Sequence, residues 1–294
     1  MDKIDKICMK DVSVVFKGKV KAVDHVNLQI ETGIFGLLGE NGAGKTTLMR
    51  VLTTLLKPSE GEVFLGDMKY SEKNYERVQK RIGYLPQELS LYPNLTLWES
   101  LMYMGEMAGI PGKKCRTTLE YYLEKTSLME HCRKKNRQLS GGMRRRAGLV
   151  QALLHDPEVL IVDEPTTGLD PEERIRIRNL LVEFGQNRIV LFSTHVIEDL
   201  SATCRELAVM KGGRIIYTGS IRALMKQAEG HVWSANITNE QILDKLPKHC
   251  HIASKQLTET GIKVRLISQD APAFSCMAEE VTLEDAYIYV SNGN

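Results

Sequence analysis

One short segment restricts the possible folds of this 294-residue chain more than any other. Gly39-Glu40-Asn41-Gly42-Ala43-Gly44-Lys45-Thr46 fits the pattern G-x-x-x-x-G-K-[ST]. Strand-type residues at 34–38 precede it, and a helical pattern over 46–56 follows it. Glycines at positions 39, 42 and 44 allow the backbone to turn its N–H groups inward, where they form a nest for anions. The segment therefore predicts a phosphate-binding loop between a strand and a helix.

The side chains of this loop suit a nucleotide with magnesium. Lys45 is expected to reach the β- and γ-phosphates, and the Thr46 hydroxyl is expected to ligate Mg²⁺. The helix that begins at Thr46 adds the positive end of its dipole. A glycine-rich turn without a ligand is the alternative. The predicted nucleotide contacts in the loop are Gly39, Asn41, Gly42, Ala43, Gly44, Lys45, Thr46 and Thr47.

A second segment places two carboxylates at the end of a buried strand. Val159 to Val162 is continuously apolar, as in central strands of parallel sheets, and Asp163 and Glu164 follow it. In such sheets ligands bind at the carboxyl ends of the strands. Asp163 is therefore predicted to hold Mg²⁺ through water, and Glu164 to polarise the water that attacks the γ-phosphorus. Carboxylates that only satisfy a turn or a helix N-terminus are the alternative.

The remaining pattern predicts an α/β protein with an insert and a tail. Short β-type runs surround the loop, helical periodicity takes over at about 88–138, and strands alternating with helices return up to residue 219. This alternation predicts a parallel sheet covered on both faces. Residues 220–294 mix strand-like and helical pieces, and a final helix is expected to begin with a capping box at Thr282-Leu283-Glu284-Asp285. We expect domains over 1–219 and 220–294.

A rarer motif lies just after the helical insert. Leu139-Ser140-Gly141-Gly142, followed by three arginines at 144–146, resembles the signature motif of ABC-type ATPases. Met143 stands in the place of the usual glutamine, and Glu40 in the phosphate loop replaces a common proline or serine. Both departures are expected to be tolerated, because the groups that face phosphate are Ser140, the glycine amides and the helix N-terminus.

Other motifs of that family follow in order, so the resemblance covers residues 7–219. Gln87 resembles the Q-loop glutamine, Gly168-Leu169-Asp170 the D-loop, and His195 the switch histidine. Phe16 stands where the family has an aromatic residue stacked on adenine, with an ordinary β-core position as the alternative. The segments at 91–96 and 282–285 look most like ATP-binding subunits of ABC-2-type exporters from bacteria and archaea, whose membrane part is a separate chain.

The resemblance implies a P-loop NTPase core with a parallel sheet, an antiparallel β subdomain and a helical subdomain, followed by a small α+β extension. It also implies two subunits paired head to tail around two ATP molecules. The residues that it assigns to catalysis are Glu164, His195 and Lys45. Those assigned to Mg²⁺ are Thr46, Gln87 and Asp163. Those assigned to ATP outside the phosphate loop are Phe16 and Gln87, with Ser140, Gly141, Gly142 and Asp170 acting in trans.

The function that follows from the resemblance is ATP binding and hydrolysis for transport, in the export direction, through a separately encoded polytopic permease. No apolar run approaches the roughly 18 residues of a membrane-spanning helix, so we expect this chain at the cytoplasmic face of the membrane, attached through the permease. A second ATPase subunit is the other expected partner. The permease is expected to dock between the Q-loop region and the helical insert, where Tyr92, Leu95 and Leu97 are candidate contacts.

The rival class is an ABC ATPase that acts on ribosomes or nucleic acid. Only 53 positions separate Gln87 from Ser140, which leaves no room for the long coiled coil of DNA-repair types, and one cassette is present where translation factors have two. The formal net charge of +2 also gives no general nucleic-acid footprint, although residues 88–150 carry a net +5. We expect no nucleic-acid partner. A P-loop kinase or GTPase would leave the signature motif and His195 unexplained.

Overall fold

The computed structural model describes residues 4–18, 20–238, 243, 246–247, 249–259 and 261–293. The chain divides into two compact units. Unit 1 comprises Met1–Cys204 and Met210–Ile215, and unit 2 comprises Arg205–Val209 and Ile216–Asn294.

The predicted parallel sheet has four strands in unit 1 and two, β9 and β10, whose residues are divided between units 1 and 2. Its strand order is β10-β9-β3-β8-β7-β6, in which β3, β8, β7 and β6 run parallel to one another. Both β7 and β8 are buried along their whole length, as their continuous apolar sequences require. The strands are β3 (Gly33–Leu38), β6 (Ile82–Leu85), β7 (Val159–Asp163), β8 (Ile189–Thr194), β9 (Glu206–Lys211) and β10 (Arg214–Ser220).

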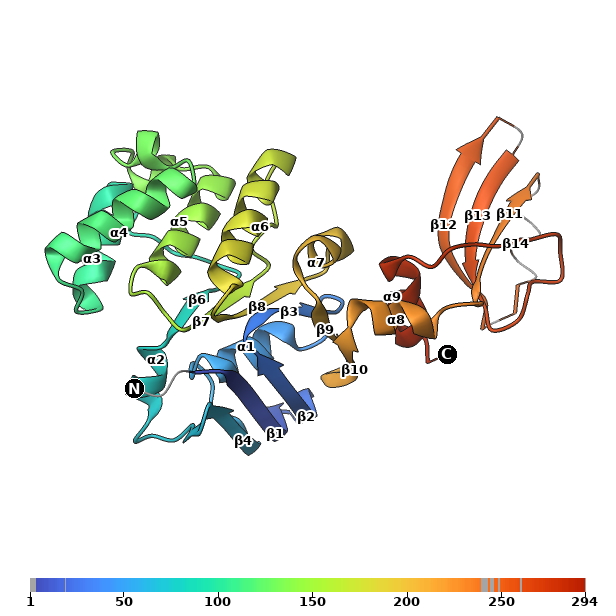
Figure 1. The fold of residues 1–294 in the computed structure, drawn as a ribbon, viewed down its shortest axis with the longest axis horizontal. Coiled ribbons are helices and arrows are strands. Elements are labelled where there is room, and N and C mark those ends of the chain that lie inside the picture. The colour runs from blue at the N-terminus through green and yellow to red at the C-terminus, as the bar shows by residue number, and fades with distance from the viewer. Residues whose placement is uncertain are drawn as a thin grey trace. The chain divides into compact units, whose positions relative to one another are not determined.

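A second, antiparallel sheet lies beside this core. Its order is β2-β1-β4-β5, and Figure 1 shows its long strands in blue at the lower edge of unit 1. Register shifts interrupt the pairing of β1 with β2, so the two strands twist strongly. The strands are β1 (Lys6–Phe16), β2 (Val20–Glu31), β4 (Glu60–Leu65) and β5 (Met68–Lys69).

Helix α1 (Lys45–Leu52) contacts both sheets, through β2 and β7. It ends four residues earlier than the pattern over 46–56 predicts. The reason is local: the Thr53 hydroxyl donates to the carbonyl of Met49 at 2.9 Å, and Thr54 adopts a left-handed backbone conformation with φ of 61°. The other helices of the core are α2 (Tyr75–Gln79), α6 (Pro171–Gly185) and α7 (Ile197–Thr203).

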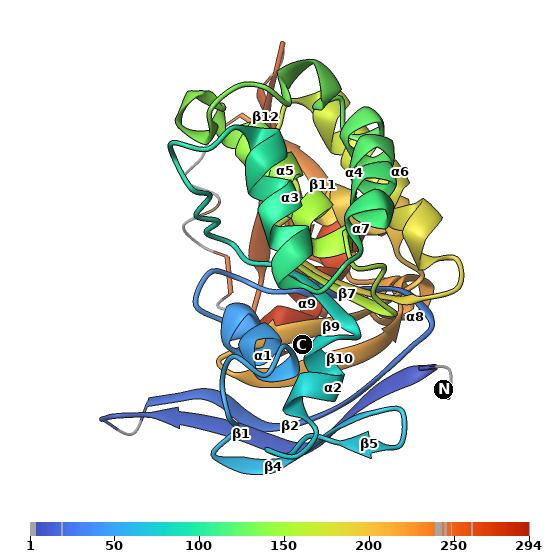
Figure 2. The same ribbon diagram turned by 90° about the vertical axis from the view of Figure 1, so that its left-hand side faces the viewer.

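The helices of the insert pack with α5, which follows the insert, and form a small core within unit 1. Helices α3 (Leu97–Met107), α4 (Gly112–Lys125) and α5 (Gly141–Leu153) contact one another pairwise and lie together in Figures 1 and 2. Short 3-10 turns at Met129–His131 and Asn136–Gln138 lead into α5. Helix α3 begins with a capping box between Thr96 and Glu99. The buried core that these helices share consists of Leu97, Leu101, Leu119, Leu123, Leu128, Leu139, Ala147, Val150 and Leu154.

Among its described residues, unit 2 contains a four-stranded sheet and two helices, the α+β mixture expected for the tail. The strand order is β12-β13-β11-β14, and helices α8 and α9 contact each other. The predicted capping box at Thr282 and Asp285 is confirmed. No helix within the described ranges is long and apolar enough to cross a membrane. The elements are α8 (Ile221–Gln227), β11 (Val232–Ile237), β12 (His251–Thr258), β13 (Gly261–Ile267), β14 (Met277–Ala278) and α9 (Leu283–Ser291).

One buried ion pair fixes α9 to the sheet of unit 2. The Asp285 carboxylate is almost fully buried and accepts hydrogen bonds from the Arg265 guanidinium at 2.7 and 2.8 Å and from the Thr282 hydroxyl at 2.6 Å. Burial raises the pKa of this carboxyl, but the hydrogen bonds from Arg265 and Thr282 outweigh it, so the pKa is lowered in the folded chain.

We therefore expect Asp285→Asn to destabilise the protein by roughly 3 kcal/mol at neutral pH, because it leaves the largely buried Arg265 guanidinium with only its longer ion pair to Glu279, at 3.7 Å. Since the folded pKa is lowered, this stabilisation is fully present above the unfolded carboxyl pKa of about 3.9 and is lost as the pH falls through the folded pKa. Thermal unfolding of wild type and Asp285→Asn, followed over a range of pH, measures this difference in stability. The exposed residue Glu259, changed to Gln, is the control; a gap between wild type and Asp285→Asn that persists in strong acid would contradict this account.

Candidate nucleotide-binding and hydrolysis site

The predicted phosphate loop connects the end of β3 to the start of α1, and its glycines are required by close backbone packing. Gly44 precedes α1 with a φ of 106°, a left-handed conformation that other residues rarely adopt. A Cβ atom on Gly44 would lie 2.2 Å from the carbonyl oxygen of Ala22, and one on Gly39 would lie 2.4 Å from that of Met210. The neighbouring strands therefore fix the shape of the loop.

Lys45 turns back into this loop. Its Nζ atom donates to the carbonyl oxygens of Gly39 at 2.6 Å and Glu40 at 3.0 Å, and the residue is only 5% exposed. Burial lowers the pKa of the Lys45 ammonium, while the carboxylates of Glu164 and Asp163 oppose that shift. A buried cation held by two carbonyls at a helix N-terminus is poised to exchange those weak partners for phosphate oxygens.

Asp163, Thr46 and Ser193 form a chain of hydrogen bonds between the start of α1 and the ends of β7 and β8. The Thr46 hydroxyl donates to one Asp163 oxygen at 2.7 Å, and the Ser193 hydroxyl donates to the other. Asp163 is 1% exposed and ends β7. A hydroxyl and a carboxylate in contact at a phosphate loop are hard oxygen donors of the kind that Mg²⁺ prefers, so these residues fit the ion.

Glu164 adopts an unusual backbone conformation, with a φ of 51°. A non-glycine residue in this region costs on the order of 1–3 kcal/mol, and such residues cluster at functional sites. Three groups hold it: its N–H donates to the carbonyl and the hydroxyl oxygen of Ser193, both at 3.1 Å, and its carbonyl accepts from Arg145 at 2.8 Å. The residue is 5% exposed, so its carboxylate faces a restricted space.

His195 lies against that carboxylate. The Nδ1 atom of its ring is 2.9 Å from Glu164 Oε1, while the side chain remains 43% exposed. The Thr167 hydroxyl donates to the other carboxylate oxygen at 3.2 Å. The structure thus joins Glu164, which follows β7, with His195, which follows β8. The exposure of the ring leaves Nε2 available for a further partner.

Gln87 follows β6 in an exposed loop, and its carbonyl is fixed by a residue that the sequence analysis did not single out. Arg145 donates to the carbonyls of Gln87 at 2.8 Å, Pro86 and Glu164. In the sequence, Arg145 is marked only as one of three arginines in a basic helix. Helical periodicity was the available signal, because Arg145 lies on the same face of α5 as the buried residues Leu149 and Ala152.

The residues predicted to act in trans lie at two helix N-termini. The Ser140 hydroxyl caps α5 by accepting from the Met143 N–H at 3.1 Å, and Asp170 caps α6 by accepting from the Glu173 N–H at 2.9 Å. The two ends are neighbours, because a Cβ on Gly142 would lie 2.8 Å from Glu173 Oε2. The signature motif and the D-loop therefore form one surface region; their action on a partner's nucleotide remains a prediction.

The remaining predicted residues lie nearer the surface. Phe16 ends β1 with 45% of its surface exposed, which is incompatible with the β-core alternative and leaves the ring free to stack. Among the candidate permease contacts, Tyr92 is 51% exposed, but Leu97 is fully buried in the helical core. The expectation for Leu97 is wrong, because it is the first residue of α3 and points into the bundle.

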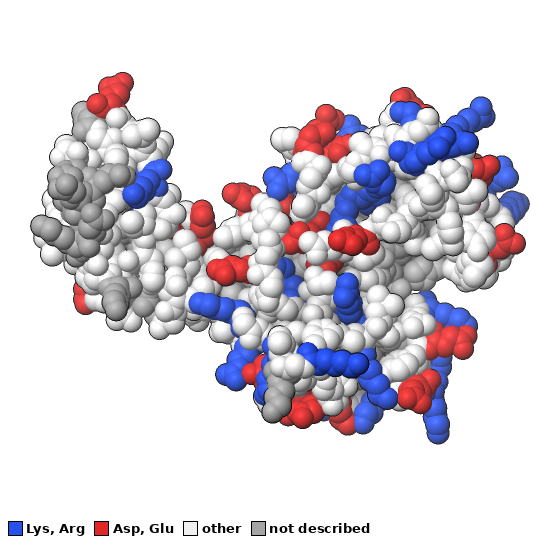
Figure 3. Space-filling view, turned by 180° about the vertical axis from the view of Figure 1, so that it is seen from behind, with Lys and Arg blue, Asp and Glu red and all other residues white. Residues whose placement is uncertain are grey.

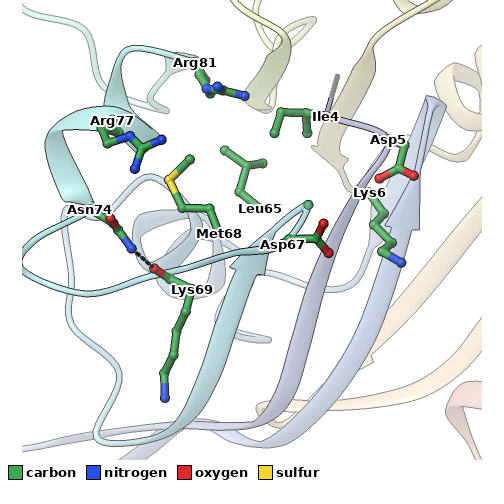
Figure 4. A pocket seen from close by; sticks show the side chains of 11 residues that line it. Ile4, Asp5, Lys6, Leu65, Asp67, Met68, Lys69, Asn74, Arg77 and Arg81 are labelled. Carbon is green, nitrogen blue, oxygen red and sulfur yellow. Dashed lines mark hydrogen bonds between the residues drawn. The ribbon is translucent and has the colours of Figure 1, made fainter. Parts of the chain in front are cut away.

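Two hollows lie away from these residues. One, of about 550 Å³, is lined by α3 and α4 and includes Trp98, Met102, Tyr103 and Ile110. The other, of about 690 Å³, is lined from β1, β4, β5 and α2, with Lys6, Arg77 and Arg81 around Met68 and Leu65 (Figure 4). Neither includes a residue of the predicted nucleotide site.

Comparisons with known proteins identify the family of this chain. The family model described as ABC transporter matches residues 23–167. The chain is 38% identical to the uncharacterised ABC transporter ATP-binding protein YxlF of Bacillus subtilis over 218 residues, 74% of this chain and 72% of YxlF. It is 29% identical to the methionine import ATP-binding protein MetN of Carboxydothermus hydrogenoformans, over 98% of this chain and 89% of MetN. The solved dimeric cassette MJ0796, bound to ADP and phosphate, matches 73% of this chain and 98% of its own with a TM-score of 0.65 and 25% identity.

This chain belongs to the ABC transporter family, as an ATP-binding subunit. It has the P-loop NTPase fold of ABC cassettes, as the sequence predicted. It is an ATPase whose activity is coupled to transport, with ATP and Mg²⁺ as its nucleotide and metal.

We expect Lys45→Ala to weaken ATP binding at least roughly tenfold, because it removes a charge-assisted contact to phosphate. The melting temperature should change little, since removal of the buried ammonium also removes its desolvation cost. Titration with a fluorescent ATP analogue measures the affinity. Lys57→Ala, at an exposed pair with Glu72, is the matched control and should bind like wild type. Unchanged affinity of Lys45→Ala would refute the phosphate-loop assignment.

Proposed function

We propose that two such subunits dimerise around two Mg-ATP molecules and power export through a separately encoded polytopic permease, at the cytoplasmic face of the membrane. The observation that carries this proposal is the joining of Glu164 with His195 beside the Thr46–Asp163 pair. Together these residues supply a base and metal-ligating oxygens next to a phosphate loop, which is what phosphoryl transfer to water needs.

In this proposal each residue has one task. Lys45 binds the β- and γ-phosphates, and Glu164 orients and polarises the attacking water. His195 holds the Glu164 carboxylate through Nδ1 and presents its exposed edge to the γ-phosphate. Thr46 and Asp163, with Gln87, would hold Mg²⁺, which neutralises charge on the phosphates when it is bound. Phe16 would stack on adenine through its exposed ring.

The dimer is proposed from the caps of α5 and α6. Ser140, Gly141 and Gly142 offer backbone N–H groups and a helix N-terminus, and Asp170 lies beside them at the start of α6. An isologous two-fold interface would place this region over the phosphate loop of the second subunit. ATP would then join the two subunits, and its hydrolysis would release them.

The permease contact is proposed for the apolar hollow on α3 and α4 and the segment before it. Tyr92 and Tyr103 meet edge to face with ring centroids 5.6 Å apart, and both are exposed. With the half-buried Leu95, they offer aromatic and aliphatic area of the kind that protein partners cover. A short helix of the permease is the proposed occupant.

The support for export is the resemblance of the segments at 91–96 and 282–285 to exporter subunits. The relatives do not share one direction of transport, because one of them is named for methionine import. The rival, an ABC ATPase that acts on ribosomes or nucleic acid, would need an extended basic surface. On the face drawn in Figure 3, Lys and Arg side chains are interspersed with Asp and Glu over unit 1. That distribution favours the transporter.

We expect Glu164→Gln to lower steady-state ATP turnover by roughly 10²-fold or more, because the water loses its base while phosphate contacts remain. The variant should accumulate as an ATP-bound dimer. ATPase assays with size-exclusion chromatography in Mg-ATP measure both. Glu158→Gln, at the opposite end of β7 from Glu164, is the control and should turn over like wild type. Undiminished hydrolysis by Glu164→Gln would show that Glu164 is not the base.

The transporter proposal has its own test. We expect the Glu164→Gln variant, added to gently solubilised membranes with Mg-ATP, to retain a polytopic membrane protein in stoichiometric amount, identified by mass spectrometry. Tyr92→Glu combined with Tyr103→Glu should abolish that retention but not nucleotide binding, because the charges would fall on the proposed docking surface. Ribosomes or nucleic acid in place of a membrane protein would favour the rival class.

A further inference from the structure

A buried arginine connects the signature helix to both loops of the hydrolysis site. Arg145, in the second turn of α5, is 9% exposed and directs its guanidinium at three main-chain carbonyls. One terminal nitrogen donates to Pro86 and Gln87, and the other donates to Glu164. The ion pairs found among the described residues do not include Arg145, so its hydrogen bonds there go to main-chain carbonyls, while the more distant carboxylates of Asp163 and Glu164 favour its charge.

The three acceptors occupy special places in the fold. Strands β6 and β7 are parallel neighbours, with Leu85 opposite Val162. Pro86 and Gln87 directly follow β6, and Glu164 directly follows β7. The guanidinium therefore ties together the first turns after two adjacent strands. One of those turns carries the predicted Q-loop glutamine, and the other carries the predicted base.

The turn at Glu164 needs such support. Its left-handed backbone persists only if the surrounding groups determine it. Ser193 holds the N–H of Glu164 from the β8 side, and Arg145 holds the carbonyl from the α5 side. Since the peptide planes on both sides of the Cα atom are fixed, the carboxylate has a fixed starting direction toward His195. Loss of either support would let the backbone relax.

We propose that Arg145 is a positioning residue, which fixes the backbone of Glu164 and links its carboxylate to the signature helix and the Q-loop. This inference rests on the proposed role of Glu164 and extends it. Arg145 affects the reaction only through the backbone groups that it binds, which are the carbonyls of Pro86, Gln87 and Glu164. Ser140, the N-cap of α5, belongs to the predicted dimer surface. A displacement of α5 would therefore move Arg145 and, through it, the backbone of Glu164.

The geometry also distinguishes Arg145 from the arginine next to it. Arg146 is equally buried, but it donates to the carbonyl of Thr126 and pairs with Glu173, within the helical insert and α6. Within the described ranges none of its hydrogen bonds or ion pairs reaches the turns after β6 or β7, so Arg146 holds the helices together. Only one of the two adjacent buried cations reaches the hydrolysis site.

The test compares kcat and KM for ATP hydrolysis by the full chain. We expect Arg145→Met to lower kcat roughly ten- to hundred-fold, as for a base displaced by about 1 Å, with KM changed less than about threefold. Arg145→Lys keeps the charge, but one ammonium cannot span both turns, so it should recover only part of kcat. If Arg145→Met fails to fold, the Lys variant decides alone: wild-type kcat for it would overturn the proposal.

A matched control separates positioning from stability. Arg81 is 8% exposed, lies at the opposite end of β6, and pairs with Glu158 at 3.3 Å. Arg81→Met should lower the melting temperature like Arg145→Met but leave kcat within about twofold. An equal fall of kcat in both variants would assign Arg145 to stability only and overturn the inference.

A double-mutant cycle tests whether the effect of Arg145→Met on turnover depends on Glu164. A purely structural role of Arg145 would not produce that dependence. In the Glu164→Gln background the base is already absent, so Arg145→Met should lower the residual turnover by less than about twofold. Additive losses would overturn the inference while the proposed function stands. Absence of Glu164-dependent hydrolysis in the wild-type chain would instead overturn the proposed function, and the inference with it.

Discussion

The hydrogen-bonded register of four parallel strands is the constraint on which the rest of this structure depends. Leu38 at the end of β3 pairs with Thr194 in β8, and Asp163 at the end of β7 pairs with Ser193. Because the strands are parallel, their carboxyl ends meet at one edge of the sheet, and the loops that follow them meet there too. A slip of one residue would turn the Asp163 side chain to the opposite face and break its contact with Thr46.

Two buried cations near that edge are held by main-chain carbonyls. Lys45 bonds to the loop that it belongs to, whereas Arg145 bonds to turns from elsewhere in the chain. Burial lowers the pKa of both groups. Each cation carries a desolvation cost that nearby carbonyls and the carboxylates of Asp163 and Glu164 offset. The benefit is a site whose charges and backbone are oriented before the substrate binds, which is the main source of electrostatic catalysis.

Local sequence signals predicted much of the fold. Capping at Thr282 and the strand ending in Asp163 were predicted correctly, because each depends on neighbouring residues alone. The two predictions that failed concern the end of a helix and the direction of a side chain. The helix after the phosphate loop ends at Leu52 because the Thr53 hydroxyl competes for its carbonyls, and Leu97 is buried because of how α3 packs on its neighbours.

The sequence by itself determined the phosphate loop, the acidic strand and the order of the motifs, since glycine positions and apolar runs act through local backbone conformation and burial. Tertiary structure alone decided which distant groups meet. Arg145 lies 58 positions from Gln87 and 19 from Glu164 along the chain, and no short pattern encodes those contacts. They exist because strand register and helix packing bring separate turns together, and register is a property of the assembled sheet.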